Sequence, residues 1–217
     1  KVVTGGNRFI WDLRYPGFKS FEGMVLYSSP NVGPKAVPGT YRVRLTYNGI
    51  ASEKEFTIVK DPRLPNTETD FKNQFDFLIK VRDQVNRANQ AIIDIRSVKK
   101  DLAYVKEKVT TDEDLNKLVE EFETKLDKVE NNIHMTKNQS RQDPLNYGIR
   151  INNRLAFLMS DSQRGDYPPT DQSLAFFKEI KKELDIEIDS LNDLFEAYVN
   201  KINSQVSDKQ IKMISTN

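Results

Sequence analysis

The sequence lacks the residues on which several classes of protein depend. It has no cysteine, which excludes a disulfide framework, a thiolate nucleophile and a cysteine-based metal site. It also has no glycine-rich phosphate loop and no apolar run long enough to span a bilayer. Its net charge of +1 gives no global field that would attract nucleic acid or a membrane surface. We therefore expect neither nucleic-acid binding nor membrane insertion.

Glycine and proline become scarce after residue 65. Of the nine glycines only Gly148 and Gly165 lie beyond that point, and most of the nine prolines lie before it. The run Asp61-Pro62-Arg63-Leu64-Pro65 forbids both continuation of a strand and entry into a helix. We therefore predict two domains, over residues 1–64 and 65–217. The chain opens on Lys1 without an initiating methionine, so we expect it to be part of a longer protein.

The most regular pattern runs from Asp70 to Val109 and contains neither proline nor glycine. From Leu78 onward, apolar residues recur at alternating steps of three and four, interrupted only by Lys99 and Lys106. A repeat of 3.5 residues is typical of a long helix that packs lengthwise against other helices. We predict a helix over about 70–109, and we expect its final third, which holds both lysines, to be looser or more exposed.

Three further stretches have helical periodicity. They predict helices over about 112–138, 145–160 and 171–205, and residues 111–114 supply a cap and an acidic first turn for the first of these. Four amphipathic helices joined by short connections favour an antiparallel four-helix bundle with coiled-coil-like long helices. The tail over 206–217 has no clear pattern.

The first 64 residues show the period-2 alternation of half-buried strands. The clearest case is a pair of strands around Asn48-Gly49, a favoured two-residue hairpin turn. Shorter alternating or apolar runs precede it at 9–13 and 24–27. Strands with turns at this spacing predict a small antiparallel Ig-like β-sandwich. The expected fold class is therefore α+β, a sandwich followed by a helical bundle.

Residues suited to chemistry are few. His134 is the only histidine, and a lone histidine on a charged helix is expected to face solvent rather than to serve catalysis or bind metal. Trp11 is either the core anchor of the first domain or a sugar-stacking residue. Asn146, Asn152 and Asn153 carry amides that must find hydrogen-bond partners inside a bundle, where they would fix its register. We expect no catalytic residue, no cofactor and no metal, hence no enzyme.

Several motifs resemble those of a known bacterial family. They are Gly6-Asn7-Arg8-Phe9, Trp11-Asp12-Leu13-Arg14-Tyr15-Pro16-Gly17, Gly33-Pro34, Pro38-Gly39-Thr40-Tyr41-Arg42-Val43-Arg44-Leu45, Asp61-Pro62-Arg63, Leu145-Asn146-Tyr147-Gly148-Ile149-Arg150-Ile151-Asn152-Asn153-Arg154-Leu155 and Pro169-Thr170-Asp171-Gln172. Together they resemble the C-terminal region of sortilin-like or BNR-repeat β-propeller proteins, although Gly148 stands where that family is expected to have proline.

That resemblance implies a context more than an activity. In the family, an Ig-like sandwich and a helical region follow the propeller, so the chain would be an exported protein of a Bacteroidetes-like bacterium, in the cell envelope or secreted, represented without its propeller. Any glycosidase site of such a protein would belong to the propeller, and no catalytic residue carries over onto this sequence.

We therefore expect a non-catalytic structural and protein-interaction module, with the upstream propeller and a cell-envelope protein as partners. Lys99 and Lys106 are candidate partner contacts because they interrupt the seam of the long helix. The alternative is a carbohydrate-binding accessory module that uses exposed aromatic residues, namely Tyr15, Phe18 and Phe21.

Overall fold

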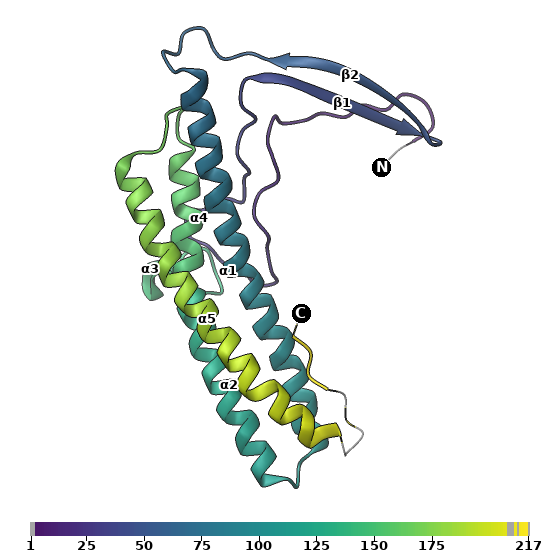
Figure 1. Cartoon of the computed structure of the whole chain (residues 1–217), viewed down its shortest axis with the longest axis vertical. Coiled ribbons are helices and arrows are strands. Elements are labelled where there is room, and N and C mark those ends of the chain that lie inside the picture. The colour runs from purple at the N-terminus through teal and green to yellow at the C-terminus, as the bar shows by residue number, and fades with distance from the viewer. Residues whose placement is uncertain (1–2, 208–210, 212, 217) are drawn as a thin grey trace.

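The protein is a rod of helices with a β-hairpin projecting from one end (Figure 1). A computed structural model describes residues 3–207, 211 and 213–216. These residues form β1 (Gly39–Tyr47), β2 (Ile50–Ile58), α1 (Glu68–Lys108), α2 (Glu113–Ile133), α3 (Pro144–Tyr147), α4 (Ile151–Ser162) and α5 (Asp171–Ser207). None of the described helices is both long and apolar enough to cross a membrane.

Helix α1 is the spine of the rod. It begins at the N-cap Thr67, whose hydroxyl accepts from the backbone N–H of Asp70 while the Asp70 carboxylate accepts from Thr67. This reciprocal capping box satisfies two backbone donors at the helix end. The helix has 41 residues and is therefore about 60 Å long. Every apolar residue of the predicted seam is buried, so the periodicity identified the packed face correctly.

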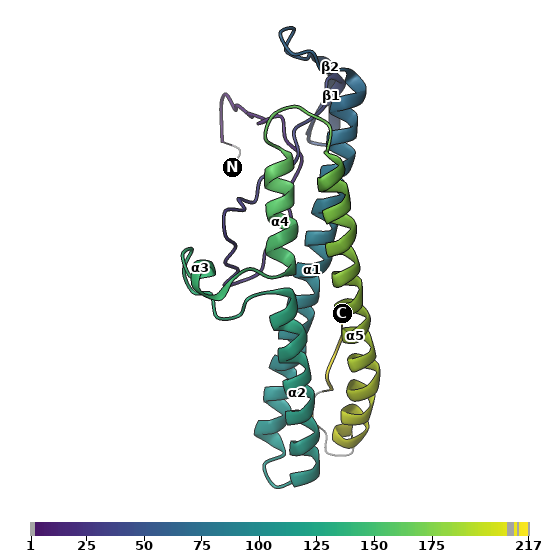
Figure 2. The ribbon, with the colours of Figure 1, turned by 90° about the vertical axis from the view of Figure 1, so that its left-hand side faces the viewer.

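Three helical columns, rather than four, make up the cross-section of the rod (Figure 2). Helix α1 runs down one column, α2 and then α4 run back up the second, and α5 descends the third. The prediction of a four-helix bundle is therefore wrong. The second column is interrupted, because α2 ends at Ile133, where His134 takes an extended conformation, and α4 starts only at Ile151.

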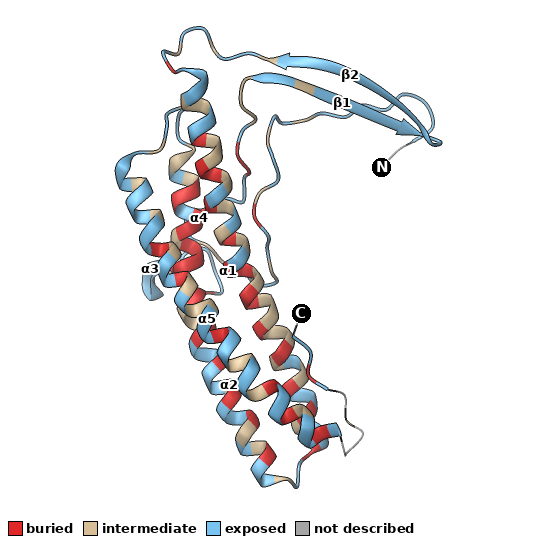
Figure 3. Cartoon of the chain, in the orientation of Figure 1, coloured by how far each residue is buried: buried red, intermediate tan, exposed pale blue. Residues whose placement is uncertain are grey.

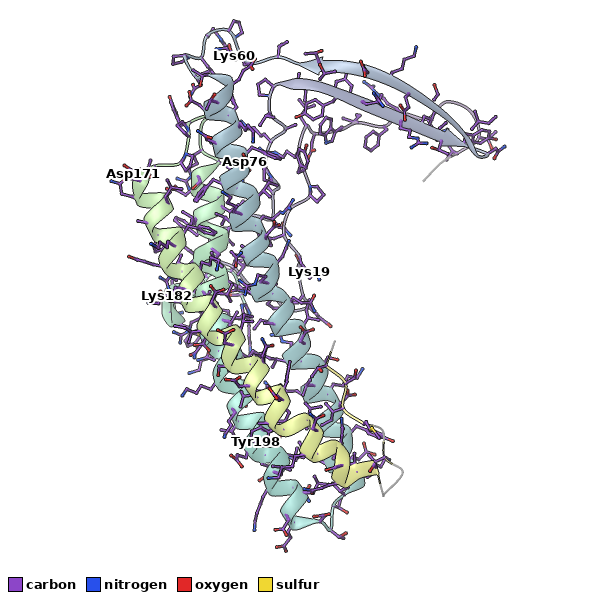
Figure 4. All side chains as sticks on the ribbon, in the orientation of Figure 1. Lys19, Lys60, Asp76, Asp171, Lys182 and Tyr198 are labelled. Atoms are coloured by element: carbon purple, nitrogen blue, oxygen red, sulfur yellow. The ribbon has the colours of Figure 1, made fainter. Side chains whose placement is uncertain are left out.

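The loop between α2 and α4 explains the interruption. The helix predicted over 145–160 divides into α3 and α4 at Gly148, which has a φ of 76° and allows the chain to turn. Helix α2 covers the lower half of α1 and packs on α5, where Phe122 stacks on Tyr198 with ring centroids 4.9 Å apart (Figure 4). Helix α4 covers the upper half of α1.

Residues 13–36 form an extended two-legged segment, called the strap here, that lies along α1 and α4 (Figures 1 and 2). Backbone hydrogen bonds join its ends at Leu13–Ala36 and Tyr15–Pro34, and a turn from Phe21 to Met24 forms its tip. The side chain of Phe18 is buried against the helical core. The strap therefore extends the helical core rather than building a sheet.

The hairpin of β1 and β2, called the arm here, is the only sheet in the described part of the chain, apart from one isolated bridge within the strap. The two-residue turn predicted at Asn48-Gly49 is confirmed, since both residues have positive φ. The Ig-like β-sandwich is contradicted: residues 9–13 and 24–27 form no strands. Residues 24–27 instead contact helices, through the bonds of Tyr27 to Asn153 and the packing of Met24 and Leu26 on the helical core, while Phe9 and Ile10 are exposed and Trp11 packs on the arm. Among the described residues no second sheet covers the arm.

The C-terminal tail returns along the lower half of α1 (Figure 1). The carboxamide of Asn203 donates to the carbonyl of Ile214 at 2.9 Å and accepts from its N–H at 2.8 Å, as a neighbouring strand would. Ile214 is buried. Of the tail for which the sequence shows no pattern, residues 208–210, 212 and 217 lie outside the described residues.

We expect Ile92→Asp to lower the free energy of unfolding by several kcal/mol, because Ile92 is fully buried and an unpaired carboxylate cannot be accommodated there. The matched control is Asn73→Asp, which adds the same charge on the exposed face of the same helix and should change stability by less than about 0.5 kcal/mol. Urea denaturation measures both. Equal midpoints for Ile92→Asp and the wild type would contradict the packing of α1.

Candidate functional site

The interruption between α2 and α4 holds a group of buried polar side chains, called the polar junction here. Its members are Asn89 and Arg96 from α1, Glu130 from α2, His134 at the end of α2 and Asn152 from the first turn of α4. Four of the five are less than 5 % exposed, and Arg96 is partly exposed. The tip of the strap lies against this junction, so four segments of the chain meet here.

A chain of hydrogen bonds crosses the junction and determines which nitrogen of His134 carries the proton. The Nδ2 of Asn89 donates to the carbonyl of Lys19 in the strap at 2.6 Å, which leaves the Oδ1 of Asn89 facing Asn152. Asn152 therefore presents its Nδ2, at 3.1 Å from that oxygen and at 3.2 Å from the Nδ1 of His134. Because an amide nitrogen only donates, Nδ1 of His134 is the acceptor and the proton of the neutral imidazole sits on Nε2. The Oδ1 of Asn152 has no partner among the described residues.

Glu130 neutralises two cations next to this chain. Its carboxylate accepts from the Nε of Arg96 at 2.8 Å and from the Nζ of Lys99 at 2.7 Å. Lys99 also pairs with Asp127. Arg96 in addition donates to the carbonyl of Glu22 at 2.7 Å and lies over the ring of Phe21. The carboxylate thus ties α2 to α1, and through Arg96 to the strap.

The structure places both seam lysines in ion pairs with α2. Lys106 reaches Glu123 at 3.2 Å and Glu120 at 3.7 Å. The outward positions at this end of α1 are more exposed, as expected, among them Ala103, Tyr104 and Glu107. The seam itself stays packed, since Val98, Leu102 and Val105 around the lysines are fully buried. Long lysine side chains can lie along an apolar seam and still bring the ammonium to an acidic neighbour at its edge.

Burial and neighbouring charges move two pKa values in opposite directions. Burial is the main cause that lowers the pKa of His134; the positive charge of Arg96 lowers it further, and the carboxylate of Glu130 opposes them. For Lys99, burial disfavours the ammonium, but hydrogen bonds to Asp127 and Glu130 outweigh burial and raise the pKa. His134 is therefore held neutral and Lys99 charged. The expectation that His134 faces solvent is wrong, since it is 2 % exposed.

A second candidate surface lies on the arm. The strand register puts Tyr41, Val43, Leu45 and Tyr47 on the same face as Phe56 and Ile50. The opposite face carries ion pairs of Arg42 and Arg44 with Glu53 and Glu55. Within the described residues only the base of the apolar face is covered, where Trp11 packs on Tyr41 and Phe56. Val43, Leu45, Tyr47 and Ile50 are 50–76 % exposed, and together they are called the open face here (Figure 3).

The aromatic residues predicted as sugar contacts do not form one exposed row. Tyr15 is 39 % exposed and packs edge-on against Phe75 of α1. Phe18 is buried, and Phe21 lies between His134 and Arg96. Trp11 is half-buried and donates its indole N–H to the carbonyl of Arg14 at 2.8 Å. Each of these rings is engaged within the protein.

A cavity of about 320 Å³ separates the base of the arm from the top of α1. Its charged side chains bind one another or the backbone: Lys35 pairs with Asp166 at 3.3 Å, and Lys60 donates to the carbonyl of Asn66 at 2.9 Å. The first contact ties the strap to the loop between α4 and α5, and the second lies within the connection from β2 to α1. In the part of the chain that the structure describes, no three histidine or carboxylate side chains gather as metal ligands would.

A comparison with protein-family models, curated proteins and solved structures finds no match to this chain. The resemblance to propeller-protein C-termini therefore stays a prediction. Of the three asparagines whose amides were expected to find partners, Asn152 belongs to the polar junction, Asn153 binds the strap and Asn146 is exposed. Asn153 indeed pairs with both backbone groups of Tyr27 in the strap, at 2.7 and 3.0 Å. The roles of Asn89 and Glu130 were missed; the one signal for Asn89 is an amide on the apolar side of a helix.

We expect Glu130→Gln to destabilise the protein by about 2–3 kcal/mol, because two partly buried cations would lose their shared counter-charge. The matched control is Asp127→Asn, which removes the 65 % exposed acid of the same network and should cost less than about 1 kcal/mol. Chemical denaturation measures both variants. Equal effects would show that burial does not distinguish the two carboxylates.

Stability should also fall with acidification through the titration of His134. The pKa of the folded state is below the ordinary value of about 6.5, so the unfolded chain binds more protons. The contribution of the neutral His134 to the free energy of unfolding is therefore complete above about pH 6.5, and it is lost as the pH falls below that value towards the pKa of the folded state. Because His134 is the only histidine, His134→Asn should flatten the dependence of the urea midpoint on pH between 7.5 and 5.5. An unchanged slope would contradict a buried neutral imidazole.

Proposed function

We propose that this chain is a non-catalytic protein-interaction module in which the helical rod is a rigid support and the arm docks on a β-sheet of a partner domain. The observation that carries the proposal is the open face. Four apolar side chains sit side by side on a two-stranded sheet, and Leu45, Tyr47 and Ile50 are each more than 70 % exposed.

Charge and shape support a sheet as the partner. The face that bears these apolar side chains has one charged residue, Lys54 across from Val43, whereas the opposite face of the arm is a ladder of arginine and glutamate pairs suited to water. Alternating apolar side chains on a strand pair match the face of another sheet, which packs about 10 Å away. A two-stranded sheet without such cover is only marginally stable, so a partner sheet would also stabilise the arm.

The partner named by the sequence resemblance is the upstream β-propeller of the same protein. A propeller is built of sheets and offers faces of the required kind. Residues 3–12 lead into the strap close to the arm (Figure 1), and Phe9 and Ile10 within them add exposed apolar surface. In this proposal the protein is exported to the bacterial envelope or secreted, and the rod projects from the docked arm toward a further envelope protein.

Photocrosslinking in the producing cells tests the docking. A benzophenone side chain at the position of Tyr47 should give products that map to strands of one partner domain. The matched position is Thr46, the adjacent residue on the opposite face, which should give none. In addition, Leu45→Asp should reduce the recovered complex at least about tenfold, as expected for an unpaired charge in an apolar contact, while Thr46→Asp changes it less than about twofold.

Two results would reject the proposal. One is equal crosslinking from Tyr47 and Thr46, which would mean that the apolar face has no preference. The other is the absence of any product at Tyr47 in cells that make the complete protein.

A further inference from the structure

The tip of the strap is attached to α1 through polar side chains at the level of the polar junction. Asn86 accepts from the backbone N–H of Lys19 at 2.6 Å, and Asn89 donates to the carbonyl of the same residue at 2.6 Å. Arg96 donates to the carbonyl of Glu22. Figure 4 shows Lys19 beside the middle of α1. Three polar side chains of α1 thus bind the tip, alongside the buried Phe18 and the partly buried Phe21 and Met24, which pack on the helical core.

His134 contacts this attachment on two sides. Its ring meets the ring of Phe21 edge-on, with centroids 5.0 Å apart. Its Nδ1 accepts a hydrogen bond from the Nδ2 of Asn152, and that nitrogen also donates to the Oδ1 of Asn89. The imidazole is therefore one residue away from the bond that Asn89 makes to the strap.

A proton on Nδ1 is incompatible with this arrangement. An imidazolium donates from both nitrogens, so its Nδ1–H would face the Nδ2 donor of Asn152. If the Asn152 carboxamide rotates, its Oδ1, which has no partner among the described residues, can accept the new proton. That rotation turns the oxygen toward the Oδ1 of Asn89 and breaks the bond between the two asparagines.

The charges around His134 do not stabilise a protonated imidazole while the strap is bound. Arg96 of α1 lies on the other side of the Phe21 ring, 4.8 Å from its centroid, and repels an imidazolium. Glu130 of α2 attracts it, but both carboxylate oxygens are engaged with Arg96 and Lys99. The strap and α4 contribute only the uncharged Phe21 and Asn152 to the contact.

We propose that the strap is an acid-sensitive clasp: protonation of His134 breaks the Asn152–Asn89 bond and releases the strap tip from α1 and α4. By linkage, opening the strap hydrates the imidazole and favours its protonation, so each event promotes the other. The device goes beyond the docking of the arm, since the arm's open face takes no part in it.

Hydrogen exchange on the full chain tests the clasp. Backbone amides of Lys19 and Tyr27, both bound by asparagine side chains, report on the strap, and amides over 115–126 in α2 report on the bundle. The protonation of the single histidine is followed by nuclear magnetic resonance in the same sample. Exchange rates are first corrected for the intrinsic pH dependence of amide exchange. As the pH falls through the His134 titration, the open population of the strap should then rise by up to about tenfold per pH unit, while the α2 amides keep their protection.

Two variants identify the trigger and the link. His134→Asn offers a side-chain amide that does not titrate, so strap exchange should lose its pH dependence. Asn89→Ala removes the link and should open the strap equally at pH 7.5 and 5.5. The proposal is overturned if the strap stays protected through the histidine titration, if α2 opens together with it, or if His134→Asn keeps the wild-type pH dependence. The exchange and titration measurements on the wild type alone decide the first two outcomes, so the test stands even if a variant fails to fold.

Discussion

The interruption of the second helical column is the constraint on which the rest of the structure depends. A continuous helix there would leave no place for the tip of the strap. Once α2 ends at Ile133, backbone groups at the end of α2 and the beginning of α4 lie inside the rod, and α4 begins without a side-chain cap. Polar side chains gather at this level: Asn152 from the start of α4 binds Asn89 and His134, and Glu130 near the end of α2 binds Arg96. Asn89 and Arg96 in turn bind the strap.

Sequence periodicity predicted the helices well because burial repeats along a helix at fixed intervals. The seam of α1 and the capped start of α2 at Asp112 are confirmed, since they depend only on local spacing and cap chemistry. The same holds for the Asn48-Gly49 turn. Periodicity says nothing about how many columns share a cross-section, and the interruption between α2 and α4 made two short helices look like two members of a larger bundle.

The sandwich was predicted wrongly because alternation reports a buried face without naming what buries it. Met24 and Leu26, in one of the predicted strands, pack on the helical core, and a strand pattern cannot distinguish this from burial by a second sheet. His134 was assigned to solvent because its neighbours in sequence are charged. Its burial depends on Phe21 and Asn152, which are distant in sequence and reach it only in the folded chain.

The strap and the arm are mechanically connected, and the place of that connection decides whether the acid-sensitive clasp affects docking. Trp11 lies just before the strap and packs on the base of the arm, while β1 begins at Gly39, shortly after the strap ends. On the other side, β2 joins α1 through a turn that Lys60 and Asp61 fix by hydrogen bonds. The arm is thus held at one side by the strap and at the other by a tight turn. Release of the tip would loosen the strap only away from these ends, because Arg14 still binds Gln163 and Lys35 still binds Asp166 beside the arm. Both supports would therefore remain, and the open face would keep its direction.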